Sequence, residues 1–305
     1  MISRLKTVLE GGHFVVTAET SPPDAADADA VLAQAGCLKG VVDAVNVTDG
    51  AGARAHMSNL ACAAILARDG IEPVLQFTTR DRNRLALQSD LIGTAALGIP
   101  NILCLHGDEV DVGDHPEAAP VHDIDSRALI TTARRMRDEG CFESGRIIDP
   151  PPKLFIGAAD MPREPGPNFD PSGVTTKIDA GADFFQTQFV FDVNALKRYM
   201  ARLCDAGVPE RANYIVGLGP LASAKSARWM NDNLFGVHVP EPMIERLEGA
   251  RDEKAEGREI CLELLQKVTE IKGIHGAHLM GPRQEQTIAE IVASSGIVSG
   301  RSGTG

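Results

Sequence analysis

The feature that most constrains the fold is a series of eight short apolar runs, rich in β-branched residues, spread along the 305-residue chain. The runs are FVVTAET (14–20), DAVNVTD (43–49), EPVLQFTT (72–79), NILCLHGD (101–108), KLFIGAA (153–159), FFQTQFV (184–190), NYIVGLG (213–219) and GAHLMGP (276–282). Segments with helical spacing lie between them, including 26–40, 83–99, 126–140, 194–207 and 255–271. Alternating strands and helices predict parallel βαβ units, because a parallel neighbour is reached only through a long crossover.

Eight near-continuous apolar strands, each buried on both faces, predict a closed (β/α)8 barrel. The competing fold, an open doubly wound sheet, more often carries a glycine-rich phosphate-binding turn after its first strand. Here the first strand is followed by SPPDAADADA, which lacks that motif. We therefore expect one barrel domain over residues 1–298, extra helices within 220–275 between the last two strands, and a flexible tail over 299–305.

Composition and charge narrow the class of protein. The chain is 43% hydrophobic and 24% charged, as expected of a globular protein with a sizeable core. Its net charge is −12 and its basic residues are scattered, so a nucleic-acid partner is not expected. The six cysteines include no C-x-x-C pair, and no apolar run is long enough for a membrane span or a signal peptide. These features predict a cytoplasmic protein with reduced thiols and no membrane partner, and they leave a homo-oligomer open.

Polar residues gather where the predicted strands end. In such barrels the chemistry lies at the carboxyl ends of the strands, because those ends and the following loops form the open mouth. The residues expected there are Glu19, Thr48, Asp49, Gln76, Asp108, Asp160, Gln186 and Gln188. Side chains from six strands are thus predicted to converge on one mouth.

Three of these residues have both a chemical and a structural interpretation. A partly desolvated carboxyl at Glu19 suits proton delivery, but a strand-end Glu can also pair with a lysine or cap a helix. Asp108 follows Gly107, which would let a flat ligand approach the backbone, yet a turn Asp after Gly is common. Gln188 needs partners for its amide, either a polar ligand or a network with Gln186.

The histidines and the single tryptophan carry no comparable signal. The eight histidines show no H-E-x-x-H motif or paired-carboxylate spacing, so a catalytic metal is not expected. Asp111 and Asp114 are interpreted as loop residues, and Asp123 and Asp125 as caps of a helix that begins near Ser126. Trp229 is interpreted as a core or helix-packing residue.

The order of several motifs resembles the methylenetetrahydrofolate reductase family over about residues 12–295. The motifs are AETSPP (18–23), NVTDG (46–50), RDRN (80–83), LGIPNILCLHGD (97–108), GDHP (113–116), DAGADFFQTQFVFD (179–192) and PLASAKS (220–226). The resemblance implies a flavin-containing (β/α)8 barrel of one-carbon metabolism. Such an enzyme reduces 5,10-methylenetetrahydrofolate, a tetrahydrofolate derivative, to 5-methyltetrahydrofolate for methionine biosynthesis. NADH or NADPH delivers hydride to FAD, and the folate then takes it from the flavin.

The resemblance also implies residue roles. Glu19 matches the family's general acid, Asp108 the aspartate beside flavin and pterin, and Gln188 the glutamine that contacts the pterin. Thr48, Asp170 and Lys177 align with flavin contacts.

The chain departs from the family pattern at several positions near the cofactor. Gln76 stands where the family commonly has histidine, His106 where it has arginine or threonine, and GAADMPR where it has G-Y-P-E-x-H-P. Ala224 aligns near an aromatic residue that closes over substrate in some members. Three interpretations stay open: an FAD enzyme, an FMN or flavin-free form that passes hydride directly from NADH to folate, and a folate-binding partner subunit without reductase activity. The retained Glu19, Asp108 and Gln188 favour catalysis.

Overall fold

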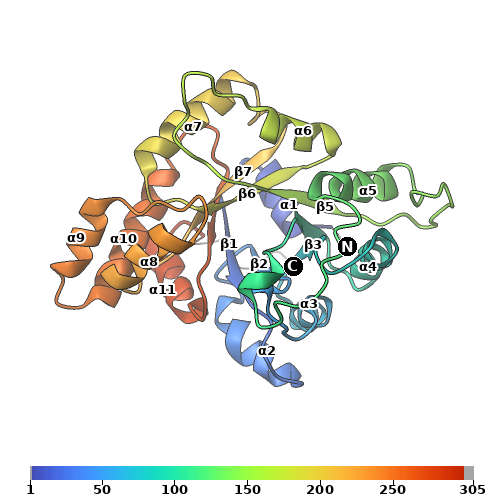
Figure 1. Cartoon of the computed structure of the whole chain (residues 1–305), viewed down its shortest axis with the longest axis horizontal. Coiled ribbons are helices and arrows are strands. Elements are labelled where there is room, and N and C mark those ends of the chain that lie inside the picture. The colour runs from blue at the N-terminus through green and yellow to red at the C-terminus, as the bar shows by residue number, and fades with distance from the viewer. Residues whose placement is uncertain (1, 299–305) are drawn as a thin grey trace.

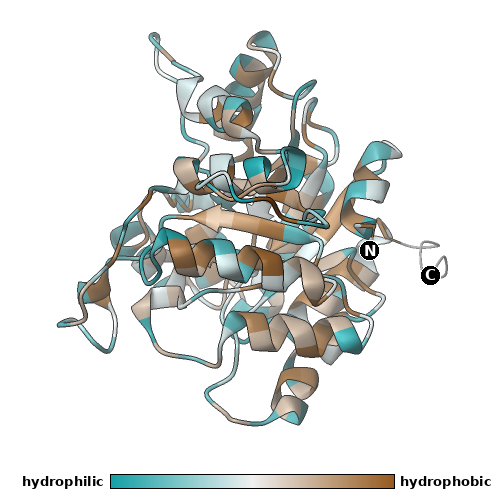
Figure 2. Ribbon diagram, turned by 90° about the vertical axis from the view of Figure 1, so that its right-hand side faces the viewer, coloured by the Kyte–Doolittle hydropathy of each residue, from teal (hydrophilic) through white to brown (hydrophobic). Residues whose placement is uncertain are grey.

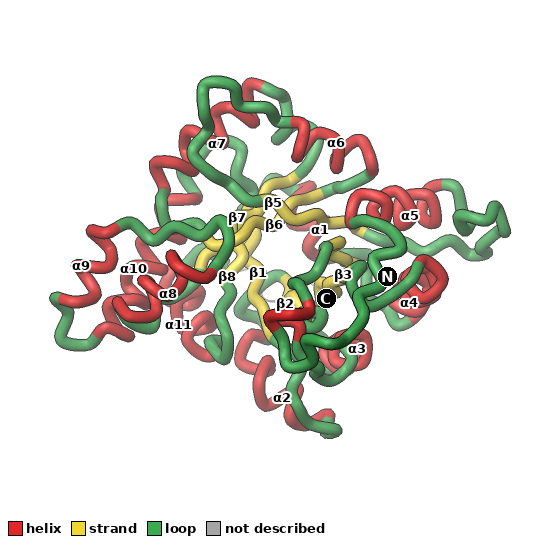
Figure 3. Tube along the Cα trace, in the orientation of Figure 1, coloured by secondary structure: helices red, strands yellow, loops and turns green. Residues whose placement is uncertain are grey.

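Eight parallel strands form a closed barrel in chain order, so the predicted fold class is confirmed. The computed structural model describes residues 2–298, and the tail expected at 299–305 lies outside the described residues. The strands are β1 (Val15–Thr20), β2 (Ala44–Val47), β3 (Pro73–Thr78), β4 (Asn101–Leu105), β5 (Phe155–Asp160), β6 (Phe184–Phe189), β7 (Asn213–Leu218) and β8 (Gly276–Leu279). They lie at the centre of the molecule with the helices around them (Figures 1 and 3). Each strand overlaps one of the eight predicted runs.

Eleven α-helices flank the barrel within the described residues. They are α1 (Arg4–Glu10), α2 (Ala28–Ala35), α3 (Asn59–Arg68), α4 (Arg84–Ala96), α5 (Ser126–Asp138), α6 (Ser172–Ala180), α7 (Val193–Asp205), α8 (Ala224–Asn233), α9 (Glu241–Glu248), α10 (Glu253–Val268) and α11 (Glu285–Ser295). The extra helices expected within 220–275 are α8, α9 and α10. Several helices begin after an Asn or Asp whose side chain accepts a backbone N–H, as Asn83 does for α4 and Asp192 for α7.

The strands consist mainly of buried apolar residues, whereas the outer surfaces of the helices face solvent. Figure 2 shows a hydrophobic strand in the middle of the molecule and hydrophilic residues spread over helices and loops. The expectation for Trp229 is wrong, since its exposed fraction on α8 is 55%. Helix α8 packs inward through Ala224 and Ala227, and two further helical positions turn Trp229 to the opposite side. No helix among residues 2–298 combines the length and apolar character of a membrane span.

A small apolar cluster closes the barrel at the end where the strands begin. Leu5 and Leu9 of α1 pack against side chains from seven of the strands, namely Val15, Ala44, Val74, Leu103, Phe155, Phe184 and Ile215. Successive side chains in a strand point to opposite faces, so the residues two positions further along β1, β2 and β6 also face the barrel interior. Those residues are Thr17, Asn46 and Gln186, and they begin a polar layer above the apolar floor.

Candidate functional site

Glu19 lies near the carboxyl end of β1, and its side chain is 22% exposed. The Gln76 amide on β3 donates to Glu19 Oε2 over 3.1 Å, and His278 Nε2 on β8 lies 3.7 Å from the same oxygen. Oε1 has no hydrogen-bond partner among the described residues. One oxygen is therefore held by the protein, while the other is left for a ligand.

A buried hydrogen-bonded layer lies directly beneath Glu19. Asn46 of β2 and Gln186 of β6 exchange two hydrogen bonds across the barrel, of 2.6 and 3.1 Å. The Gln186 amide also donates to Thr17 Oγ1 over 3.1 Å, and Thr17 Oγ1 lies 2.9 Å from His278 Nδ1. All four side chains are buried. We call this set, Thr17, Asn46, Gln186 and His278, the polar layer.

The sequence reasoning missed three members of the polar layer, Thr17, Asn46 and His278. A signal existed, because Thr17 precedes Glu19 by two positions and Asn46 precedes Thr48 by two. In a strand that spacing places both side chains on one face. Of the two alternatives for Gln188, the network with Gln186 is not formed, since Gln186 bonds to Asn46 and Thr17 instead.

Gln188 lies at an irregularity in the barrel. The pairing between β6 and β7 shifts register between Gln186 and Phe189, which is a bulge. The Oε1 of Gln188 accepts the Phe189 N–H over 2.9 Å, and its amide nitrogen has no partner among the described residues. Bulges often redirect a side chain beside a functional site. This one leaves two amide N–H donors of Gln188 available to a ligand.

Asp108 and Gly107 follow β4, and the position of the missing Gly107 side chain is closed by neighbouring residues. A Cβ placed on Gly107 would lie 3.0 Å from the Arg80 Cβ and 3.2 Å from the Thr78 Cβ, so the space beside it is filled by the protein. Gly107 has φ +100°, a backbone conformation that favours glycine. The exposed Asp108 accepts the Gly52 N–H over 2.7 Å.

The loops after β2 and β4 meet over that part of the barrel. Their short 3-10 turns, η2 (Ala51–Ala53) and η3 (Val110–Val112), pack against each other. The Arg80 guanidinium joins the loops by donating to the carbonyls of Gly50 and Asp108 over 3.2 and 3.0 Å. A hollow of about 450 Å³ remains beside them, lined in part by His56, His115 and Arg82.

Three of the residues predicted to lie at the cofactor, Thr48, His106 and Gln76, have contacts in this part of the barrel. Thr48 is buried and donates to Ser21 Oγ over 3.1 Å, on the same side of the barrel as Glu19. His106 instead stacks on His122 with 4.2 Å between ring centroids, and its side chain is 55% exposed. Gln76, predicted among the cofactor contacts, bonds directly to Glu19. The structure thus brings Gln76 and Glu19 together and leaves His106 in a loop contact.

Asp170 and Lys177 lie on the other side of the mouth, before and within α6. Asp170 accepts from the Ser172 hydroxyl and N–H over 2.6 and 2.9 Å, and these bonds lower the pKa of its carboxyl. Lys177 Nζ donates to the carbonyl of Ala159 over 2.7 Å. Burial lowers the pKa of this ammonium, and the nearby charge of Asp160 opposes that shift. Lys177 therefore reaches the end of β5 as a partly desolvated cation.

The Asp160 carboxylate accepts hydrogen bonds from both tyrosines of the chain. Tyr199 OH donates to Asp160 Oδ2 over 2.9 Å, and Tyr214 OH donates to the same oxygen. Burial, followed by the charge of Asp160, raises the pKa of both phenols. Asp160 is thus committed to a structural contact between β5, β7 and α7.

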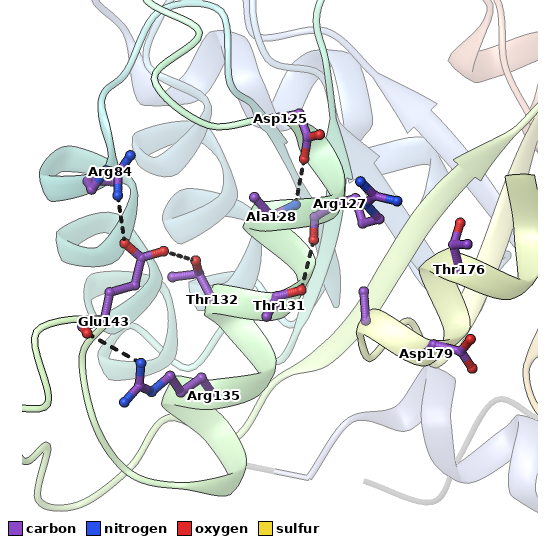
Figure 4. Close-up of a pocket in the computed structure, with 11 residues that line it drawn as sticks. Arg84, Asp125, Arg127, Ala128, Thr131, Thr132, Arg135, Glu143, Thr176 and Asp179 are labelled. Atoms are coloured by element: carbon purple, nitrogen blue, oxygen red, sulfur yellow. Dashed lines mark hydrogen bonds and ion pairs between the residues drawn. The ribbon is translucent and has the colours of Figure 1, made fainter.

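A larger hollow, of about 830 Å³, lies among α5, α6 and the start of α4 (Figure 4). Arg84 pairs with Glu143 across it, Arg135 donates to the Glu143 carbonyl, and Asp125 caps α5 through the Ala128 N–H. None of the predicted catalytic residues lines it. Within residues 2–298 no group of three or more His, Cys, Asp or Glu side chains is arranged to hold a metal ion. The barrel mouth therefore remains the candidate site.

The site and fold define a class, a (β/α)8 barrel with a partly buried carboxyl and free amide donors at its mouth. A sequence model of the family described as methylenetetrahydrofolate reductase matches residues 4–296. The chain belongs to the methylenetetrahydrofolate reductase family, which confirms the resemblance seen in its motifs.

Individual relatives are distant. Methylenetetrahydrofolate reductase 2 of Schizosaccharomyces pombe is 24% identical over 82% of this chain and 40% of its own length. A probable methylenetetrahydrofolate reductase (NADPH) of Caenorhabditis elegans is 23% identical over 79% of this chain and 34% of its own. The Escherichia coli 5,10-methylenetetrahydrofolate reductase is 30% identical over 33% of this chain and 34% of its own. The matches thus span less than half of each of these relatives.

Solved structures show the same fold at low identity. A Clostridium thermocellum protein that binds two copies of 5-methyl-5,6,7,8-tetrahydrofolic acid has a TM-score of 0.66 and 16% identity, covering 97% of this chain and 99% of that one. An F420-dependent secondary alcohol dehydrogenase has a TM-score of 0.56 and 12% identity, covering 93% of this chain and 99% of that one. At these identities the likeness concerns the fold alone.

Proposed function

We propose that this protein reduces 5,10-methylenetetrahydrofolate to 5-methyltetrahydrofolate with a nicotinamide as hydride donor. Family membership supports the reaction class. The observation that carries the proposal is the Glu19 carboxyl, with Oε2 held by Gln76 and Oε1 unbound by any described residue. A carboxyl held by one oxygen can present an acid proton on the other in a fixed direction.

The proposed chemistry assigns a step to each of three residues. Glu19 gives its proton to the folate nitrogen that leaves the methylene carbon, so that this C–N bond breaks and a cationic iminium forms. The negative charge of Asp108 stabilises the iminium, and the free amide N–H groups of Gln188 orient the pterin. Hydride from the nicotinamide then adds to the iminium carbon and completes the methyl group, leaving the oxidised nicotinamide.

FAD, the cofactor that the resemblance implies, would relay the hydride between nicotinamide and folate when bound. Thr48, Asp170 and Lys177 would be its contacts. A Cβ on Gly107 would meet Arg80 and Thr78, so the space vacated by its missing side chain does not hold a flat ring. We therefore derive no step through the flavin. The departures from the family pattern at Gln76 and His106 favour a second candidate, direct hydride transfer from nicotinamide to folate.

Absorption and turnover measurements on the purified protein test these proposals. Oxidised flavin absorbs visible light, so a colourless protein that oxidises NADH or NADPH with methylenetetrahydrofolate supports direct transfer. A yellow protein supports the FAD route. Folate binding without turnover with either donor would contradict the proposed reaction and favour a non-catalytic binding subunit.

The Glu19→Gln variant tests the acid. Loss of a positioned acid typically costs ~10²- to 10⁴-fold in rate, and we expect a loss in that range for folate reduction. The amide keeps an oxygen for Gln76, so thermal stability and the affinity for the nicotinamide should stay close to wild type. A variant that retains turnover, or that loses stability and nicotinamide affinity together with turnover, assigns Glu19 to structure.

A further inference from the structure

His278 is a buried histidine in contact with Glu19. Its side chain is 3% exposed, on β8, the strand that closes the barrel against β1. Nδ1 lies 2.9 Å from Thr17 Oγ1, and Nε2 lies 3.7 Å from Glu19 Oε2. The imidazole therefore spans from the polar layer to the carboxyl at the mouth.

The polar layer determines which ring nitrogen carries the proton. Both amide hydrogens of Gln186 are used, one on Asn46 Oδ1 and one on Thr17 Oγ1. Thr17 Oγ1 thus accepts from Gln186, and the acceptor available to its own hydrogen among the described residues is His278 Nδ1. A neutral imidazole that accepts at Nδ1 carries its hydrogen on Nε2. That hydrogen faces Glu19.

We propose that His278 is a positioning residue for Glu19, fixed as the Nε2–H tautomer by the polar layer. Together with Gln76 it supplies two donors directed at Oε2, so the acid proton resides on Oε1, the oxygen that faces the ligand. The 3.7 Å separation exceeds a hydrogen bond, so the contact aligns the carboxyl electrostatically. This inference rests on the role proposed for Glu19 above.

Two substitutions at His278 separate the functions of its nitrogens. An Asn side chain places a polar atom close to the position of Nδ1 and can keep the Thr17 contact, but it does not reach Glu19. A Gln side chain is longer and can place its amide nitrogen near the position of Nε2. We expect His278→Asn to lower kcat for folate reduction by ~10- to 100-fold with little change in KM for folate, since misplaced catalytic groups cost up to ~10²-fold. His278→Gln should recover most of that loss.

His275→Asn is the matched control. His275 directly precedes β8, and its Nδ1 accepts the Tyr214 N–H over 3.0 Å. Among the described residues it shares no hydrogen bond with Glu19 or with the polar layer. Its kcat should equal that of the wild type. Equal kcat in His278→Asn and wild type, or equal losses in the Asn and Gln variants at position 278, overturns the proposal.

A nitrogen-15 NMR measurement of the imidazoles tests the tautomer without any turnover. We expect the Nε2–H form for His278 in the wild type, loss of that preference in Thr17→Val, and a shift of the His278 Nε2 resonance in Glu19→Gln that His275 does not share. An Nδ1–H or doubly protonated His278 overturns the inference, because it requires the amides of Asn46 and Gln186 to be reversed or the Thr17 hydrogen to be unpaired. An inactive wild type with the expected spectra instead contradicts the proposed function and leaves the tautomer established.

Discussion

Gly217 on β7 is the position at which a single methyl group should disturb the barrel most directly. A Cβ there would lie 2.3 Å from the Thr187 carbonyl oxygen, 2.7 Å from the Gln188 carbonyl oxygen and 2.7 Å from Met280 Cε. The methionine end can move, but the two carbonyls belong to the bulge in β6 and cannot rotate away. Gly217→Ala must therefore push β6 and β7 apart where the bulge orients Gln188.

The expected cost of Gly217→Ala has two parts. Overpacking typically costs about 1–3 kcal/mol. Separation also weakens two hydrogen bonds of 2.8 Å, from Gly217 N–H to Thr187 Oγ1 and from Val190 N–H to the Gly217 carbonyl, each with a net contribution of about 0.5–1.5 kcal/mol. We expect a loss of about 2–6 kcal/mol in the free energy of unfolding, the upper value applying if both hydrogen bonds are lost.

Urea unfolding measured by circular dichroism gives this free energy. Gly173→Ala in α6 is the control, because a Cβ there meets nothing within 4 Å and Ala is favoured in helices by about 0.5–1 kcal/mol. Folate KM should rise in Gly217→Ala and stay unchanged in the control, since Gln188 moves only in the former. A loss below about 1 kcal/mol in Gly217→Ala would refute the argument that the carbonyls cannot yield.

Two further predictions concern pH and charge. Burial lowers the pKa of His275 below its usual 6.5, so the unfolded chain binds the proton more tightly and the free energy of unfolding should fall as pH decreases below 6.5. His275→Asn should reduce that slope in urea titrations at several pH values. An unchanged slope would contradict the assignment of this pH dependence to His275. Asp108→Asn keeps an acceptor for the Gly52 N–H but removes the negative charge, so steady-state folate turnover should fall about tenfold or more, or ~1.4 kcal/mol of barrier. Asp111→Asn, in the exposed loop, should change turnover by less than about threefold, or ~0.65 kcal/mol. Similar losses in both variants would point to a general effect of loop charge.

The strands could be predicted from the sequence because each one is a continuous apolar run, a pattern set by local burial on both faces. The short α1 helix was not predicted, since a seven-residue helix has little intrinsic stability and depends on docking Leu5 and Leu9 under the barrel. The space beside Gly107 could not be inferred either. It is filled by Arg80, whose position depends on carbonyls from two other loops.

The candidate site shows the same division between local and distant information. A strand-end position is local, so Glu19, Asp108 and Gln188 could be named as candidates from their places in the chain. The partner of Glu19 is distant, because Gln76 is 57 residues away in the sequence. The polar layer likewise joins Thr17 to His278 across 261 residues. Spacing within one strand can indicate that two side chains share a face, but only the closed barrel determines which strand lies opposite.

The polar layer is not required to stabilise the barrel. A fully paired set of buried polar groups can be replaced by apolar groups of the same shape at little net cost, whereas removing one partner leaves the others unsatisfied at about 1–3 kcal/mol each. The pairing of Asn46 with Gln186, and of Gln186 with Thr17, therefore avoids a penalty more than it adds stability. What an apolar layer could not provide is a direction for the His278 ring. Because hydrogen bonds are directional and apolar contacts are not, the layer can orient a proton donor toward Glu19 in a way that hydrophobic packing alone cannot.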